Sequence, residues 1–265
     1  MASDRRIGIL LGLTLALILS LGARAASAGD FYWSGPAPGV RTVEIRNIIG
    51  WIHAEPAKGN TLEVFGTKRS KHHDPERVKI ESYQEDGRIV FCAIYPNRTG
   101  AGPNVCSREG KGHSSSEEND LWVEFRVLVP KGMALEAHTV NGDILAERLS
   151  GPISAGTVNG EVRLSTSSYA EASTVNGDVT VVMTGSGWPA GLDFRTVNGS
   201  IQLDVAGTVN ANLRAETMNG AIASDFPLMI QGRAHKNRVH ATIGKGGTEL
   251  ALATLNGSID LRRAR

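Results

Sequence analysis

The chain has 265 residues, of which 31 are glycine and only 14 are aromatic (4 Trp, 4 Tyr and 6 Phe). Glycine, at about 12%, exceeds the usual ~7%, whereas an apolar content of 41% with a net charge of +1 excludes a disordered chain. Because the glycines follow no three-residue period, a collagen-like chain is excluded as well. The composition indicates a turn-rich folded protein of one or two domains.

The N-terminus has the pattern of a secretory signal peptide. Arg5 and Arg6 precede fifteen mostly apolar residues, which are followed by small residues up to Ala28. This order matches the charged, apolar and small-residue regions of such a peptide, and the apolar run is shorter than the ~20 residues of a membrane span. We expect a signal peptide over residues 1–28 with cleavage after Ala28. Cleavage after Ala25 and an uncleaved anchor are the alternatives.

Removal of that peptide leaves a chain with balanced charge. One acidic and three basic residues are lost, so 27 acidic and 28 basic residues become 26 and 25. Binding to nucleic acid usually needs a strongly basic face, which this balance does not supply. No further apolar span follows residue 28. We therefore expect an exported protein, periplasmic or extracellular at the cell surface, with no transmembrane segment in the mature chain and no nucleic-acid partner.

Residues 29–130 are predicted to be a β-rich N-terminal section. Ten aromatic residues lie here, against four in residues 131–265. Alternating apolar residues bounded by turn residues predict strands over 42–47, 51–55, 61–67, 78–83, 88–95 and 121–129. The section ends at the turn formed by Pro130, Lys131 and Gly132, and no convincing amphipathic helix occurs in the mature chain.

Cys92 and Cys106 are the two cysteines of the chain. Both lie in the exported part, where an oxidising compartment permits a disulfide. A bridge would close a loop of about 15 residues, for which the chain-entropy description gives ~3 kcal/mol. We predict a structural disulfide rather than a reactive thiol or metal pair, because no Cys-x-x-Cys spacing occurs.

Residues 131–265 contain an internal repeat. The pattern T-x-N-G occurs six times, and stretches of alternating apolar residues flank it. Its turn residues are Asn141, Gly142, Asn159, Gly160, Asn176, Gly177, Asn198, Gly199, Asn219, Gly220, Asn256 and Gly257. The first five copies are 17 to 22 residues apart, and the last follows after 37, about two periods, with Asn237 where a degenerate copy would fall. Repeats of this length are typical of solenoids and arrays.

Each copy predicts a strand, an Asn-Gly turn, a second strand and a second turn. An antiparallel meander would use Asn-Gly as a hairpin turn, because both residues tolerate positive φ. In a β-solenoid, equivalent residues would stack ~4.8 Å apart in parallel ladders. We favour the all-β solenoid because stacking also explains the recurring Thr and aliphatic positions, and because six Asn amides can form a ladder. The solenoid is predicted over residues 131–265, or as one continuous domain over 42–262.

The chain ends in Asp260-Leu261-Arg262-Arg263-Ala264-Arg265. These residues coincide with the last predicted strand, and three arginines there would discourage further strand pairing at an open solenoid end. We interpret the segment as an end cap, with a contact for anionic envelope polymers as the alternative.

Three features of the sequence resemble a known family. The stretch from Val43 to Ile52, the bridge from Val127 to Gly132 and the serial T-V-N-G-D-I copies are similar to the bacterial putative adhesin domain family, over about residues 43–261. The resemblance implies a β-solenoid-like domain of bacterial origin that is exported or associated with the cell envelope. Asn47-Ile48-Ile49-Gly50 departs from T-x-N-G, which indicates a first coil rather than a standard repeat.

The residues that follow Asn-Gly include Asp143, Glu161 and Asp178. Stacked in register, these carboxylates would form one column, which is a candidate Ca²⁺ site because that ion prefers oxygen ligands. Our preferred interpretation is a solvated turn edge with no metal, in which Arg148 and Arg163 relieve the repulsion between like charges. We expect no cofactor.

The leading functional hypothesis is a non-enzymatic adhesin-like domain for binding or scaffolding at the cell envelope, with envelope polysaccharide or protein as the candidate partner. A carbohydrate-active β-helix enzyme that uses the acidic column is the first alternative, since such enzymes cleave with paired carboxylates. An accessory or sensor domain of an envelope-stress system is the second. No G-x-S-x-G, H-E-x-x-H or phosphate-loop motif occurs.

Overall fold

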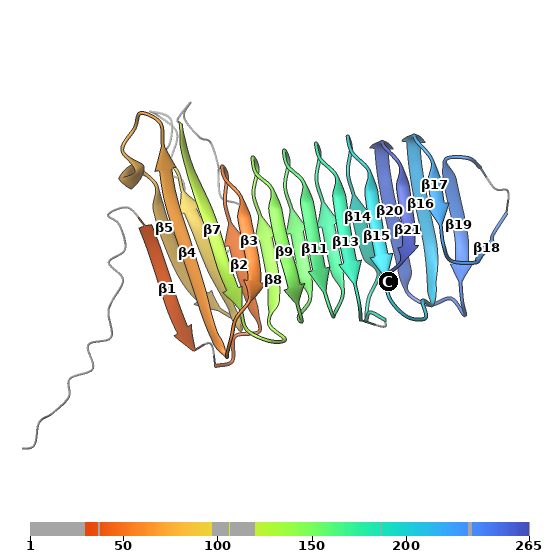
Figure 1. The fold of residues 1–265 in the computed structure, drawn as a ribbon, viewed down its shortest axis with the longest axis horizontal. Coiled ribbons are helices and arrows are strands. Elements are labelled where there is room, and N and C mark those ends of the chain that lie inside the picture. The colour runs from red at the N-terminus through yellow and green to blue at the C-terminus, as the bar shows by residue number, and fades with distance from the viewer. Residues whose placement is uncertain are drawn as a thin grey trace, which may run out of the picture.

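The fold is all-β and elongated (Figure 1). The computed structural model describes residues 30–36, 38–96, 106, 120–185, 187–232 and 235–264. These residues contain 21 strands and one short 3-10 helix, η1 (Pro75–Arg77). The predicted signal peptide lies outside the described residues. Within the described part of the chain, no helix is long and apolar enough to cross a membrane.

Two long sheets face each other along the whole length of the molecule. The first sheet contains, in spatial order, β1 (Asp30–Pro36), β4 (Thr61–Ser70), β7 (Leu121–Val129), β3 (Ile52–Pro56), β9 (Ile144–Leu149), β11 (Val162–Thr166), β13 (Val179–Met183), β15 (Ile201–Val205), β21 (Ile259–Arg263) and β17 (Ile222–Ser224). The second sheet contains β18 (Leu228–Ile230), β19 (Arg238–Ile243), β16 (Ala211–Asn219), β20 (Glu249–Asn256), β14 (Leu192–Arg195), β12 (Ala170–Ser173), β10 (Ile153–Gly156), β8 (Ala134–His138), β2 (Thr42–Arg46), β6 (Arg88–Ile94) and β5 (Lys79–Glu85).

The repeat section is a β-solenoid, as predicted. Successive strands β8 to β15 alternate between the two sheets, so that each coil contributes one strand to each sheet. Strands of neighbouring coils pair in parallel, for example β10 with β8 and β11 with β13. The Asn-Gly turn therefore carries the chain from the second sheet to the first. It is not the tip of an antiparallel hairpin, and the meander alternative is wrong.

The core lies between the sheets and follows from the period-two sequence pattern. Leu135 and Ala137 of β8 face Ile144 and Ala146 of β9, and all four are at most 1% exposed. One hydrophobic cluster of such residues extends from Val40 to Leu261. The side chains are mainly aliphatic because the space between the sheets is narrow and filled by single layers from each strand.

The six strands predicted in the N-terminal section have the counterparts β2 to β7. The strand β1 was not predicted. It pairs with β4 in antiparallel fashion, and its Phe31 and Trp33 pack edge-on against Phe91 with ring centroids 6.0 and 5.4 Å apart. Phe91, Phe125 and Tyr95 of this section are buried in the core, and Phe31 and Trp33 of β1 pack against it at the N-terminal end of the solenoid.

The spatial order of the coils differs from their order in the sequence (Figure 1). The last coil, β20 and β21, lies between the coil β14–β15 and the coil β16–β17. The chain therefore leaves a one-coil gap after β15, forms β16 and β17 beyond it, and fills the gap with its C-terminal strands. The interval of 37 residues is explained by this return, and the expectation of a degenerate copy near Asn237 is wrong.

The residues between β17 and β20 form the end of the solenoid instead. Strands β18 and β19 pair with each other, and β19 pairs with β16, all in antiparallel fashion. The backbone carbonyl of Asn237 accepts a hydrogen bond of 2.9 Å from the backbone N–H of Thr217. The prediction that the C-terminal segment caps an exposed end is also wrong, because β21 is paired on both sides, with β15 and with β17.

A similar displacement occurs at the N-terminal end. Strand β2 lies between β8 and β6, and β3 lies between β9 and β7, so the coil β6–β7 is stacked outside the earlier coil β2–β3. Beyond it, the antiparallel strands β5, β4 and β1 complete this end. Antiparallel strands therefore finish both sheets at this end, whereas at the other end they finish only the second sheet, because the first sheet ends in β17, which pairs with β21 in parallel.

Removal of residues 248–265 tests the inserted coil. Leu250, Leu252, Ile259 and Leu261 are at most 1% exposed, and burial of each contributes ~1.5–3 kcal/mol. The burial free energy lost when these four residues are removed is therefore comparable to the whole free energy of unfolding of a domain, ~5–15 kcal/mol. We expect the truncated chain to show no cooperative thermal transition by circular dichroism. A cooperative transition only slightly below that of the full chain would mean that these strands lie at an end.

Candidate functional site

The six T-x-N-G turns lie along one long edge, between the ends of the second-sheet strands and the starts of the first-sheet strands. Each threonine side chain is 4–8% exposed. Its hydroxyl donates to the carbonyl oxygen of the glycine in the neighbouring coil at 2.8–3.1 Å, in the same way in all six copies. A buried hydroxyl that is satisfied in this way fixes the distance between adjacent turns.

The asparagine side chains form a continuous amide ladder on the surface of this edge. In each of five links, one Nδ2 donates to the Oδ1 of the next asparagine at 2.8 Å. The spatial order is Asn141, Asn159, Asn176, Asn198, Asn256 and Asn219. The position of Asn256 between Asn198 and Asn219 repeats the coil order given by the strands.

The turn glycines are required by close approach of stacked backbones. A Cβ atom added at Gly177 would lie 2.0 Å from the carbonyl oxygen of Gly160, and the other five turn glycines give 1.9–2.2 Å. The positive-φ explanation predicted for both turn residues is wrong for asparagine. Among the described residues other than glycine, only Asp86 and Arg148 have positive φ.

In five of the six copies the residue between Thr and Asn is exposed, whereas Val140 of the first copy is only partly exposed. Val158, Val175 and Val197 are 37–38% exposed, and Leu255 and Met218 are 39% and 64% exposed. The edge therefore presents an aliphatic column beside the amide ladder, at the spacing of strands in a sheet. In the sequence this variable position is visible only as part of the strand pattern.

The acidic column is occupied by contacts within the protein. Asp143 Oδ1 accepts a hydrogen bond of 2.8 Å from the backbone N–H of Glu161. Asp178 Oδ1 accepts one of 2.7 Å from Ser200 N, and Glu161 forms an ion pair with Arg163. Asp143 and Asp178 thus hold the amides of the next coil, whereas Glu161 is paired with Arg163. The structure does not group these three residues as ligands of one cation.

The first coil replaces the Thr and Asn of the motif with Asn47 and Ile49. Asn47 Nδ2 donates to the carbonyl oxygens of Ile49, Gly50 and Val123 at 2.8–3.2 Å. The Tyr95 hydroxyl donates to Asn47 Oδ1 at 3.0 Å and accepts from Val123 N at 3.1 Å. Burial raises the pKa of Tyr95 well above its usual range. A different buried polar network therefore anchors the end of the threonine column.

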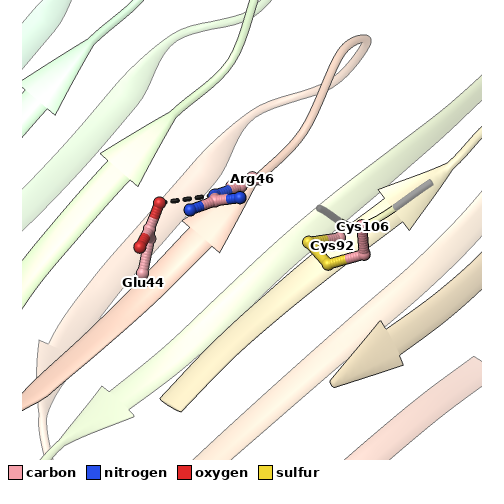
Figure 2. The surroundings of a disulfide bond; sticks show 4 residues. All are labelled: Glu44, Arg46, Cys92 and Cys106. Atoms are coloured by element: carbon pink, nitrogen blue, oxygen red, sulfur yellow. Dashed lines mark hydrogen bonds and ion pairs between the residues drawn. A yellow bond between two sulfur atoms is a disulfide. The ribbon is translucent and has the colours of Figure 1, made fainter. Parts of the chain in front are cut away.

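A charged cluster lies on the outer face of the second sheet, beside the disulfide (Figure 2). Arg46 Nε contacts Glu44 Oε1 at 2.5 Å, and Arg88 bonds both Glu44, at 2.7 Å, and Glu136. Burial opposes ionisation of Glu44, but its hydrogen bonds to Arg46 and Arg88 outweigh burial and lower its pKa.

The same cluster contains the one group of three potential metal ligands in the described part of the chain, namely Glu44, Glu136 and His138. The guanidinium groups of Arg46 and Arg88 already neutralise these carboxylates, so the group is better explained as an ion-pair network. Desolvation lowers the pKa of His138 despite the two nearby carboxylates.

Cys92 and Cys106 are joined in a disulfide with Cα atoms 5.8 Å apart. Cys92 lies on β6 and pairs in register with Arg46 of β2. The bridge therefore attaches residue 106 to the second sheet next to the charged cluster, as Figure 2 shows.

Comparison with known proteins agrees with this repeat geometry. Residues 133–262 match the Toastrack DUF4097 family. The matched residues are the repeat section of the chain. The resemblance carried by the serial T-x-N-G copies is thereby confirmed, although the match begins at Met133 rather than near Val43. No curated protein sequence matches this chain.

Three bacterial structures are among the solved structures that match this chain. A putative cell adhesion protein from Clostridium sporogenes has 12% identity and a TM-score of 0.48, with 89% of this chain and 99% of that chain covered. A putative adhesin from Bacteroides fragilis has 8% identity and a TM-score of 0.26, with 90% and 98% covered. One from Parabacteroides distasonis has 8% identity and a TM-score of 0.29, with 87% and 96% covered.

The substitution Gly177→Ala tests the close approach of the turns. The added Cβ cannot fit 2.0 Å from a backbone oxygen. We therefore expect the free energy of unfolding to fall by ~3 kcal/mol, the upper end of the usual cost of overpacking. Gly132→Ala is the control, because Gly132 has a φ of +78° but nothing within 4 Å of an added Cβ. It should cost only the ~1–2 kcal/mol of the left-handed conformation. Equal losses in urea unfolding would contradict the steric explanation.

The amide ladder predicts different effects at its middle and its end. Asn176→Ala removes one side-chain hydrogen bond on each side, whereas Asn219→Ala removes a single link to Asn256. At ~0.5–1.5 kcal/mol for each hydrogen bond, the central variant should lose about twice the free energy of unfolding. A larger loss at Asn219 in the same denaturation assay would show that the links do not contribute in this way.

The ion-pair network predicts acid sensitivity. The pKa of Glu44 is lowered in the folded state. The ionised carboxylate therefore contributes fully to the free energy of unfolding above its ordinary pKa of about 4.5, and this contribution is lost as the pH falls below that value. Glu44→Gln should lower the free energy of unfolding by ~3 kcal/mol at pH 7, because the substitution leaves Arg46 beside an uncharged partner. The difference from the parent chain should shrink towards pH 3 in thermal melts. A difference that is independent of pH would contradict the assignment.

Proposed function

We propose that the protein is an exported, non-enzymatic domain that binds or scaffolds components of the bacterial cell envelope. The observation that carries this proposal is the periodic edge. Six equivalent turns display an aliphatic column, an amide ladder and a polar column in register. A rigid surface with a repeat of ~4.8 Å is suited to an extended partner that makes the same contact several times.

The N-terminal sequence supports the export part of the proposal. Arg5 and Arg6, the following apolar run and the small residues up to Ala28 have the order of a signal peptide. The disulfide between Cys92 and Cys106 is of the kind that persists in an oxidising compartment.

The contacts of the acidic column favour binding over catalysis. A glycosidase needs one carboxyl group free to donate a proton and a second free to act as base or nucleophile. Asp143 and Asp178 instead hold backbone amides, and Glu161 pairs with Arg163. An accessory or sensor role in envelope stress would use the same binding surface and is distinguished by its partner.

Cell fractionation and envelope binding test this function. We expect the processed protein in the periplasmic or surface fraction with Gly29 as its first residue, and we expect purified residues 29–265 to co-sediment saturably with isolated envelopes. Recovery of the unprocessed chain in the cytoplasm, without sedimentation, would contradict the proposal.

The enzyme alternative needs its own assay. Purified protein should release no reducing ends from envelope glycans. Release that is abolished by joint replacement of Asp143, Glu161 and Asp178 with their amides, in a variant with an unchanged melting curve, would replace the binding function with the enzymatic one.

A further inference from the structure

The outer face of the second sheet is hollowed above β20. The hollow has a volume of about 630 Å³ and is lined by outward residues of β12, β14, β20 and β16. The strand β20 belongs to the inserted C-terminal coil. The floor of the hollow therefore comes from the last strands of the chain, and its two walls come from β14 and β16.

The hollow exists because the floor side chains are short and the wall side chains are long. Register places Ala251 between Asp193 and Arg214, and Ala253 between Arg195 and Glu216. Adjacent strands are ~4.8 Å apart, so the two walls are ~9.6 Å apart. Alanine at positions 251 and 253 of β20 thus leaves a trough one strand wide, with Glu249 of the same strand at one end.

The charges of each wall are paired within that wall. Arg195 Nε donates to Asp193 Oδ1 at 2.6 Å on β14, and Arg214 Nε donates to Glu216 Oε1 at 3.2 Å on β16. Glu216 Oε1 also lies 3.2 Å from His240 Nε2 and 3.4 Å from Arg238 Nε. No ion pair spans the trough between the described residues of the two walls, as their separation requires.

The order of charges is opposite in the two walls. One row across the trough is acidic, alanine and basic, and the next is basic, alanine and acidic. A strongly anionic or cationic ligand would meet repulsion from one group in each row. Hydroxyl groups are suited to both rows, because each can donate to a carboxylate and accept from a guanidinium group.

A second hollow continues the first across the sheet. It has a volume of about 350 Å³ and shares Glu171, Asp193 and Arg195 with the first. Its floor includes Ser154 and Ser173, which are again short side chains. The two hollows together provide room for several linked rings rather than for one small molecule.

We propose that this trough binds a neutral, hydroxyl-rich saccharide chain, with Asp193, Arg195, Arg214 and Glu216 as the hydrogen-bonding residues and Ala251 and Ala253 as the floor. The inference deepens the proposed envelope-binding function and rests on it. It adds a saccharide-binding site on a face of the second sheet to the Asn-Gly edge that carries the proposed function.

Titration of residues 29–265 with neutral oligosaccharides tests the site. The probes are maltotetraose and the tetramer of N-acetylglucosamine, with a galacturonic acid tetramer as the anionic comparison. We expect amide chemical-shift changes by NMR to be confined to β12, β14, β20 and β16 with at least one neutral probe. Affinity should change little between 50 and 500 mM NaCl, because a neutral ligand gains little from screened charges.

Two variants localise the binding. Ala253→Leu fills the floor, and Arg214→Ala removes a donor from the wall; each should weaken binding about tenfold, which corresponds to ~1.4 kcal/mol. Ala223→Leu is the matched control, since Ala223 is an exposed outward residue of β17 in the other sheet. It should bind as the parent chain does, and all three variants should keep its melting temperature within a few degrees.

Absence of shifts with both neutral probes at 10 mM would overturn the saccharide site, as would salt-sensitive binding of the anionic tetramer alone. Envelope sedimentation that persists in Ala253→Leu would overturn the trough as the envelope-binding face but would leave the proposed function in place. Saccharide binding by a protein that stays in the cytoplasm would instead refute the envelope function and keep the site.

Discussion

The hydrogen bond from each turn threonine to the glycine carbonyl of the neighbouring coil is the contact on which the architecture depends. It brings backbones so close that an added Cβ at Gly177 would lie 2.0 Å from a carbonyl oxygen. That approach in turn places asparagine amides at 2.8 Å from one another. Thr, Asn and Gly are therefore three parts of one stacking device, in which the hydroxyl is buried and the amide is at the surface.

Because every turn uses the same device, any T-x-N-G coil can stack on any other. The hydroxyl of Thr254 donates to the carbonyl oxygen of Gly199, which lies 55 positions earlier in the chain. Thr196 makes the same hydrogen bond to Gly177, in the preceding coil of the sequence. This equivalence explains how the C-terminal coil enters between two earlier coils without a special interface. It also explains why β20 and β21 have a partner strand along both edges.

The repeat and the solenoid could be predicted from the sequence because they depend on local pattern. Period-two alternation around Leu135 and Ile144 gives the strands, and the fixed Thr and Gly positions indicate stacking. The order of the coils could not be predicted, since six interchangeable turns do not specify which neighbour each will have. The antiparallel ends were missed for a related reason: β18 and β19 have no turn motif that records their partners.

The two candidate surfaces likewise differ in how far the sequence predicts them. The Asn-Gly edge, from Asn141 to Asn256, is visible in the sequence because it repeats. The trough on the second sheet is not, because Asp193, Ala251 and Arg214 become neighbours only when the last coil enters its gap. Alanine at an outward strand position has no signal of its own in a sequence. Its meaning comes from the longer side chains on both sides, which are supplied by other coils.

The order of the coils is tested most directly by distances among three isoleucines, of which two are buried and Ile222 is partly buried. Ile259 pairs in register with both Ile201 and Ile222, so neighbouring positions are ~4.8 Å apart and Ile201 and Ile222 are ~9.6 Å apart. Methyl-labelled isoleucine in an otherwise deuterated chain should give strong nuclear Overhauser effects from Ile259 to each of the other two. A strong effect between Ile201 and Ile222, with none between Ile201 and Ile259, would show that the coils stack in sequence order and would contradict the inserted coil.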